Sequence, residues 1–156
     1  MRQTGEIHAV ELSENAIRDA FQIAPERLDH LKAIGRFIGR DWGMKVELGK
    51  PGEGSCFDQV HNRIQLDPLH LADSQRADMA EFVAAHEGGH RAVTRTGESL
   101  GLTKERVKTL YSQLGFGFGF NAVEDPAENN WWSRQYDGLE PAMRRTYDAQ
   151  FEKDAA

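Results

Sequence analysis

A chain of 156 residues with 39% hydrophobic residues and 15 glycines is long enough to bury the core of one domain, and we expect a single domain over residues 1–156. Its net charge of −6 and pI near 5.5 argue against nucleic acid as the main partner, because phosphate binding needs a basic face. A membrane span is not expected, because no run approaches about 18 consecutive apolar residues. The N-terminus lacks the apolar core of a signal peptide and the single Cys56 excludes an internal disulfide, so we expect a cytoplasmic protein or one domain of a longer chain.

The first half of the chain predicts helices, a strand and a hairpin. A short helix is expected over residues 13–21, and a longer one over 25–42, which begins with a proline and carries apolar residues at helical spacing. Residues 44–48 alternate between apolar and polar and predict a strand. Two further strand-like runs, 56–60 and 63–67, flank His-Asn and predict a hairpin, because asparagine tolerates the left-handed conformation of tight turns.

Residues 82–93 form an apolar, alanine-rich run that predicts a helix and contains the pattern His-Glu-x-x-His. His86 and His90 are four residues apart, so both imidazoles share one face and can bind one zinc ion at roughly 2.0–2.1 Å. Glu87 lies about 100° further round the helix, where its carboxylate can take a proton from a water that the metal activates. The alternative is a solvated helix face, or core histidines satisfied by hydrogen bonds.

Two glycines inside this helix favour the metal site over the alternative. Gly88 and Gly89 each cost about 1 kcal/mol against alanine in a helix interior. We expect them to permit the close approach of another backbone or of a substrate. The whole helix is expected over residues 74–96, with Asp73 or Ser74 as its N-cap.

The pattern resembles that of the zincin metallopeptidases. The resemblance implies an α+β fold in which a small, mostly antiparallel sheet packs beside several helices with the metal helix at the centre. The hairpin before the helix is similar to the zincin layout, in which an edge strand lies above the cleft and can hold an extended peptide. An ordinary hairpin whose edge is blunted by Arg63 and Gln65 is the alternative.

Residues beyond the motif predict two more helices and one biased segment. A helix is expected over residues 100–114, capped by Thr103, and another from Pro141 onward. Between them, residues 115–120 alternate glycine with phenylalanine, which predicts either a strand with one aromatic face or a loop. We expect this segment to form a mobile wall of the cleft; a plain loop is the alternative.

A catalytic zinc site needs a third protein ligand, and residues 121–130 hold the best candidates. One helical turn would place Asn121, Glu124 and Glu128 on one face. Glu124 could then bind the metal, and Glu128 could accept a hydrogen bond from a ligand imidazole. This is similar to the gluzincins, whose third ligand is a glutamate on a later helix with an acidic residue four positions on. Asp125 is the alternative ligand, and an acidic solvated turn is the alternative for the whole segment.

These residues lead us to expect a zinc-dependent metallopeptidase that acts on a peptide or protein substrate. His86, His90 and Glu124 would bind Zn²⁺, and Glu87 would be the general base. Tyr136 is a candidate donor to the developing oxyanion, although it could simply pack. One alternative is a zincin-like domain that holds metal but serves as a non-catalytic binding or regulatory module. Another is a structural helical domain without metal.

Overall fold

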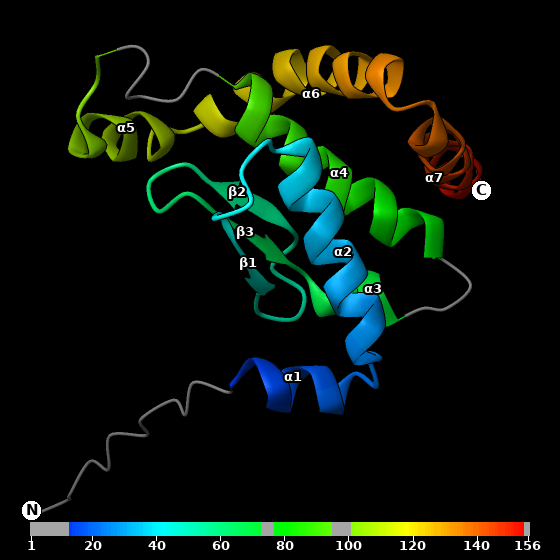
Figure 1. The fold of residues 1–156 in the computed structure, drawn as a ribbon. Coiled ribbons are helices and arrows are strands. Elements are labelled where there is room, and N and C mark those ends of the chain that lie inside the picture. Colours follow the sequence, from blue (N-terminus) through cyan, green and yellow to red (C-terminus); the bar gives the residue numbers. More distant parts are fainter. Residues whose placement is uncertain (1–12, 73–76, 95–100, 155–156) are drawn as a thin grey trace, which may run out of the picture.

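The computed structural model describes residues 13–72, 77–94 and 101–154, and it is mainly helical with one small sheet (Figure 1). Its elements in chain order are α1 (Glu14–Ala20), α2 (Pro25–Ile38), β1 (Lys45–Leu48), β2 (Cys56–Asp58), β3 (Arg63–Leu66), α3 (Pro68–Ala72), α4 (Ala77–Val93), α5 (Lys104–Tyr111), α6 (Phe116–Gln135), the 3-10 helix η2 (Asp137–Leu139) and α7 (Glu140–Asp154). This combination is compatible with the expected α+β class. Within the described ranges, no helix combines the length and the apolar character that crossing a membrane requires.

The sheet has the strand order β1-β3-β2, so β3 is its central strand. β2 runs antiparallel to β3, with Phe57 opposite Ile64, whereas β1 runs parallel to β3, with Val46 opposite Ile64. The expectation of a mostly antiparallel sheet is therefore wrong, because the sheet is mixed. The reason is the turn over residues 49–55, which carries the chain from β1 to the far edge, so that the hairpin places β3 between β1 and β2.

Asp67 holds this turn in place. Its carboxylate accepts hydrogen bonds from the backbone N–H groups of Gly52, Gly54 and Leu69, each at 2.9 Å. Gly52 and Gly54 have φ values of +83° and +81°, a conformation that glycine adopts without steric cost. Burial would raise the pKa of Asp67, but the three N–H donors outweigh burial and hold this pKa below its ordinary value. The route of the turn therefore depends on one buried carboxylate.

The predicted hairpin between β2 and β3 is confirmed. Asp58 lies opposite Arg63, and Asn62 has a φ of +49°, the left-handed conformation expected of it. Arg63 and Gln65 lie on the central strand and so do not blunt an edge. The edge strand of the hairpin is β2, and it contacts α4.

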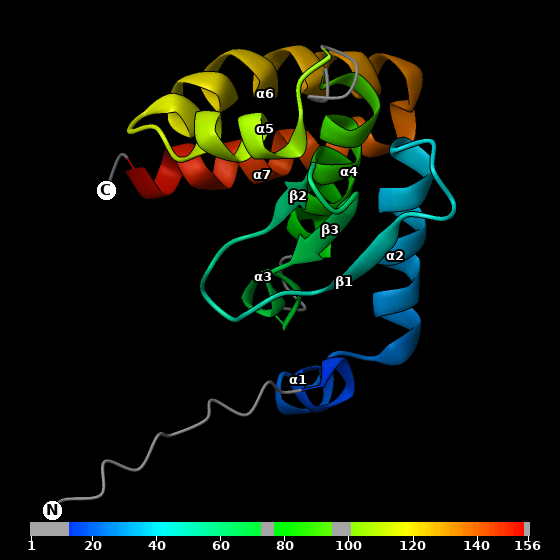
Figure 2. The same ribbon diagram turned by 90° about the vertical axis from the view of Figure 1, so that its left-hand side faces the viewer.

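Helix α4 is the central element of the fold. It lies between α2 and the sheet on one side and α6 and α7 on the other, as two perpendicular views show (Figures 1 and 2). The large side chains fully buried in the core around it include Leu31 and Ile38 of α2, Ile64 and Leu66 of β3, and Trp132 of α6. The histidine motif is therefore held by packing on both sides of its helix.

The two glycines of the motif lie at close contacts, as expected. A Cβ on Gly88 would lie 2.7 Å from the backbone oxygen of Gly35 and 3.1 Å from the Cβ of Ile38, both in α2. A Cβ on Gly89 would overlap the carboxylate of Glu128 in α6. Gly88 thus admits the backbone of α2, and Gly89 admits an acidic side chain beside the histidines.

The glycine–phenylalanine segment, residues 115–120, is neither a strand nor a loop, because helix α6 begins at Phe116. Residues four apart share a helix face just as alternate residues share a strand face, so the alternating pattern suits both. In the helix, the rings of Phe116 and Phe120 stack at 5.9 Å, and both pack edge-on against Tyr111 of α5. This aromatic packing favours the helix.

Helix ends agree with the sequence in part. The hydroxyls of Ser13 and Thr103 accept backbone N–H groups in the first turns of α1 and α5, which confirms both caps. Helix α2 ends at Ile38, earlier than the expected residue 42. The expected N-cap of the motif helix, Asp73 or Ser74, lies outside the described residues, and α4 ends at Val93, earlier than the expected residue 96.

Candidate metal centre

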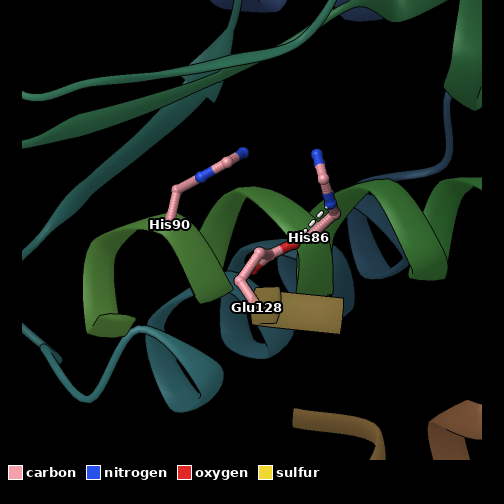
Figure 3. Close-up of side chains that lie close together, drawn as sticks. All are labelled: His86, His90 and Glu128. Atoms are coloured by element: carbon pink, nitrogen blue, oxygen red, sulfur yellow. Dashed lines mark ion pairs between the residues drawn. The ribbon is translucent and has the colours of Figure 1, made fainter. Parts of the chain in front are cut away.

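Helix α4 places both histidines of the motif on one face, as predicted (Figure 3). The ring centroids of His86 and His90 are 4.7 Å apart. Glu128 reaches them from α6, and one ligand atom from each of the three side chains lies within 4.8 Å of the other two. This group could hold a metal ion, and its geometry alone does not specify which one.

Hydrogen bonding assigns the proton of His90 to Nδ1. The Thr94 hydroxyl donates to the Glu124 carboxylate, which can only accept, so the Thr94 oxygen is left to accept from His90 Nδ1 at 3.2 Å. Burial and then the positive charge of His86 lower the pKa of His90 to about 4, so its ring is neutral near pH 7. His90 Nε2 therefore carries a free lone pair, the state that a metal ligand needs.

His86 also has an acceptor at Nδ1. Glu128 Oε1 lies 2.5 Å from this nitrogen and Asn129 Oδ1 lies 3.0 Å from it. The Asn129 amide is oriented by two further bonds, because its Nδ2 donates to the Tyr147 hydroxyl and its Oδ1 accepts from Trp132 Nε1. Burial would lower the pKa of His86, but the Glu128 carboxylate outweighs burial and raises it to about 9. In Figure 3, Glu128 approaches the inner nitrogen of His86 while the outer nitrogens of both rings point away from it.

Asp125 supplies a carboxylate at the outer nitrogen of His90. Its Oδ1 lies 3.4 Å from His90 Nε2, is buried, and makes no hydrogen bond within the described part of the chain. Because Nε2 carries a lone pair, two electron-rich atoms face each other there, which is costly without a cation that both can bind. Burial also raises the pKa of Asp125. Two imidazoles and a nearby carboxylate are a donor set that fits a divalent transition metal such as zinc.

Glu87 is the acidic residue placed beside the histidines on α4. It is only 7% exposed, and burial raises its pKa to about 7, although the charge of His86 and a hydrogen bond from the Phe57 backbone N–H act in the opposite direction. A carboxyl group with this pKa can both accept and release a proton near neutral pH. Burial likewise raises the pKa of Glu128 to about 7, although the contact with His86 acts in the opposite direction.

A pocket of about 350 Å³, here called the histidine pocket, opens at the motif. It lies between α4, the edge strand β2 and the helices α5 and α6, and its lining comprises Ser55, Cys56, Phe57, Gln59, His86, Glu87, His90, Tyr111, Phe120 and Asn121. The edge strand that was expected to border the cleft therefore does border this pocket. Cys56 is a free, exposed cysteine at this pocket.

The predicted site residues fall into two groups. Glu87 lines the histidine pocket with His86 and His90, and Glu124 lies close by, with its Oε2 3.9 Å from His90 Nδ1. Glu124 thus approaches His90 at Nδ1, the same nitrogen that contacts the Thr94 hydroxyl. Tyr136 does not line the histidine pocket.

The side chain of Tyr136 packs edge-on against Phe37, with ring centroids 5.1 Å apart, and against Trp131. Tyr111, rather than Tyr136, is the tyrosine that lines the histidine pocket. The sequence does not single out Tyr111, because this residue lies on the apolar face of a short helix and no pattern sets it apart there.

No protein-family model matches this chain, and comparison with curated proteins and with solved structures gives no match either. The residues of the centre and of the histidine pocket are therefore the features that indicate a function.

Proposed function

We propose that the protein is a zinc-dependent peptidase in which His86, His90 and a carboxylate of α6 bind the metal. The observation that carries the proposal is the orientation of the two rings: each Nδ1 faces an acceptor, so Nε2 is the nitrogen available for a metal. The Nε2 of His90 is already unprotonated near pH 7, whereas zinc would displace the Nε2 proton that His86, with its pKa of about 9, carries there. The same rings line a pocket that contains Glu87. Two imidazoles, one carboxylate and an open position are the usual surroundings of catalytic zinc.

Asp125 is the carboxylate that we favour as the third ligand. Of the three α6 carboxylates only Asp125 approaches His90 at Nε2, whereas Glu124 approaches His90 and Glu128 approaches His86 at Nδ1. Glu128, which has a ligand atom within 4.8 Å of both histidines, is the alternative ligand. A carboxylate at Nδ1 fixes the tautomer and the orientation of the ring, so that Nε2 can bind the metal. In this proposal Glu128 positions His86, and Glu124 acts on His90 through Thr94.

Glu87 is the proposed general base. Zinc in the centre would polarise the scissile carbonyl and lower the pKa of a water toward about 7. The Glu87 carboxylate would accept the proton of the attacking water and pass it to the leaving amine as the C–N bond breaks, which returns Glu87 to its starting state. Its pKa of about 7 suits both transfers.

The proposed substrate is a peptide or protein segment in extended conformation. Within the described residues, β2 pairs on one side only, with β3, and its residues Cys56 and Phe57 line the histidine pocket. An extended peptide could add to this edge by main-chain hydrogen bonds, which would place one of its carbonyl groups beside the histidines.

Metal analysis and cleavage assays on the same preparations test the proposal. Protein prepared without a histidine tag should contain about one zinc per chain and cleave peptides in a mixed library, as detected by mass spectrometry. Glu87→Gln should retain the zinc and lose at least about 100-fold in cleavage rate, the usual size of a general-base effect. Glu81→Gln, the same change elsewhere on α4, is the control and should cleave normally. A Glu87→Gln variant that cleaves as fast as the wild type would refute the proposed role of Glu87.

A metal-holding binding module is the second candidate function. It is favoured by one observation: the Glu87 carboxylate is almost fully buried and already accepts the Phe57 N–H, as a purely structural group would. In that case the wild type would bind zinc stoichiometrically and cleave no peptide, and Glu87→Gln would change the stability of the protein without changing any activity.

A further inference from the structure

We infer that Tyr111 is a catalytic residue of the proposed peptidase, and that its phenolic O–H donates a hydrogen bond to the oxyanion formed from the scissile carbonyl. The inference rests on the proposed function. It begins from the position of Tyr111, which lines the histidine pocket together with His86, Glu87 and His90. Tyr111 comes from α5 and the other three from α4, so the pocket joins a phenol to the proposed metal ligands and base.

The hydroxyl of Tyr111 has a proton to donate. Its oxygen accepts a hydrogen bond from Gln59 Nε2 at 2.6 Å, so this contact does not use the phenolic proton. Among the described residues, no acceptor for that proton is found. The bond from Gln59 also fixes the oxygen in place and polarises the O–H group, which makes it a better donor.

The ring of Tyr111 is held by neighbours on α6. Phe116 and Phe120 both pack edge-on against it, at centroid distances of 5.4 and 5.9 Å. Phe120 lines the same pocket. A donor contributes most to catalysis when it is already oriented before the charge develops, and packing on two rings together with one hydrogen bond supplies that orientation.

The charge state of Tyr111 agrees with a donor role. Burial and the nearby negative charge of Glu124 raise the pKa of Tyr111 above its ordinary value, although the hydrogen bond from Gln59 lowers it. The phenol therefore keeps its proton near neutral pH. A neutral O–H group can stabilise a developing negative charge without repelling the carboxylates around the centre.

The reaction gives this donor a defined task. When the attacking water oxygen bonds to the scissile carbon, the carbonyl π electrons move onto the carbonyl oxygen, which becomes negatively charged. The Tyr111 O–H would donate a hydrogen bond to that oxygen and keep its own proton throughout. When the C–N bond breaks, the electron pair returns and the donated hydrogen bond weakens. Tyr111 would then act on the chemical step more than on substrate binding.

The test compares Tyr111→Phe with Tyr136→Phe in the full, zinc-loaded chain. Tyr136→Phe is a matched control, because Tyr136 packs against Phe37 and Trp131 and does not line the pocket. Tyr111→Phe should lower kcat by about 100-fold, at the lower end of the effect of removing one oxyanion donor, with KM within about twofold of the wild type. Tyr136→Phe should leave both constants unchanged.

A binding measurement supports the kinetic one. The probe is a phosphinic peptide with the sequence of the best substrate, because its tetrahedral phosphorus and charged oxygen imitate the intermediate. Its Kd, measured by calorimetry, should rise about as much for Tyr111→Phe as kcat falls, while the zinc content stays the same. Gln59→Leu should give a smaller loss in kcat, since Gln59 only positions the phenol.

The outcomes separate this inference from the proposed function. If the wild type and Tyr111→Phe have the same kcat and the same Kd for the phosphinic peptide, Tyr111 has no catalytic role and the peptidase proposal is unaffected. If Tyr111→Phe raises KM with kcat unchanged, Tyr111 only binds substrate and the inference is wrong. If the zinc-loaded wild type cleaves no peptide, the proposed function fails and this inference fails with it.

Discussion

Replacing Gly88 by alanine should destabilise the protein, although alanine is normally the better residue in a helix. Gly88 lies between the two histidines of the motif, where α4 crosses α2. An added Cβ would lie 2.7 Å from the Gly35 oxygen, 3.1 Å from the Ile38 Cβ and 3.2 Å from the Gly39 nitrogen. Two of these neighbours are backbone atoms, so rotation of a side chain cannot relieve the contact, and the helices must separate.

The size of the effect follows from two opposing terms. Overpacking a core costs typically 1–3 kcal/mol, and a clash with backbone on a central helix belongs at about 3 kcal/mol. Alanine recovers about 1 kcal/mol of helix propensity. The free energy of unfolding should therefore fall by about 2 kcal/mol. For a domain of this length, 1 kcal/mol corresponds to about 2–4 °C, so the Tm should fall by about 4–8 °C.

Thermal and urea unfolding of the metal-free protein, followed by circular dichroism, measure this change. Gly119→Ala is the matched control, because Gly119 lies in α6 and an added Cβ would meet no atom within 4 Å. There only the propensity term acts, so Gly119→Ala should stabilise the protein by about 0.5–1 kcal/mol. The two identical substitutions should thus have opposite signs. If Gly88→Ala were as stable as Gly119→Ala, the proposed close approach of α2 and α4 would be refuted.

Three further predictions concern single carboxylates. Asp67→Asn should lower stability by about 2 kcal/mol near pH 7 by weakening charge-assisted bonds. Because the folded pKa of Asp67 lies below the ordinary 3.8, the wild type holds this advantage above pH 3.8 and loses it as the pH falls further, so unfolding curves of the two proteins should converge in acid. Asp125→Asn should weaken zinc binding, measured by competition with a chelator, more than Glu124→Gln does; the reverse order would make Glu124 the ligand, as the sequence first suggested. Glu128→Gln should weaken zinc binding about 10–100-fold through the loss of its contact with His86, and unchanged affinity would show that His86 needs no such partner.

Much of the candidate site was predictable from local rules. Two histidines four apart on an apolar helix must share a face, whatever the rest of the chain does, and the structure confirms their shared face. The same holds for the caps at Ser13 and Thr103 and for the hairpin at Asn62, where short-range hydrogen bonds and backbone conformation decide the outcome.

The sequence was less informative where one pattern suits two structures. Glycine–phenylalanine alternation is compatible with a strand and with a helix. The structure has a helix here, which is favoured by the packing of Phe116 and Phe120 against Tyr111 of α5. The mixed sheet was unexpected for a similar reason. The bonds from Gly52 and Gly54 to Asp67, which follows β3, guide the chain to the far edge, and a local pattern does not reveal them.

The amino-acid sequence by itself determined that two imidazoles and one carboxyl group lie together on a helix, because helical geometry depends only on residue spacing. Tertiary structure alone decided which of three carboxylates on α6 meets which histidine nitrogen, since that depends on how α6 docks against α4. It also decided that Tyr111, and not Tyr136, lies in the histidine pocket. The physical reason is the same in both cases. Contacts between segments that are far apart in the sequence depend on how whole helices pack against one another, and the spacing of residues along one helix does not determine that packing.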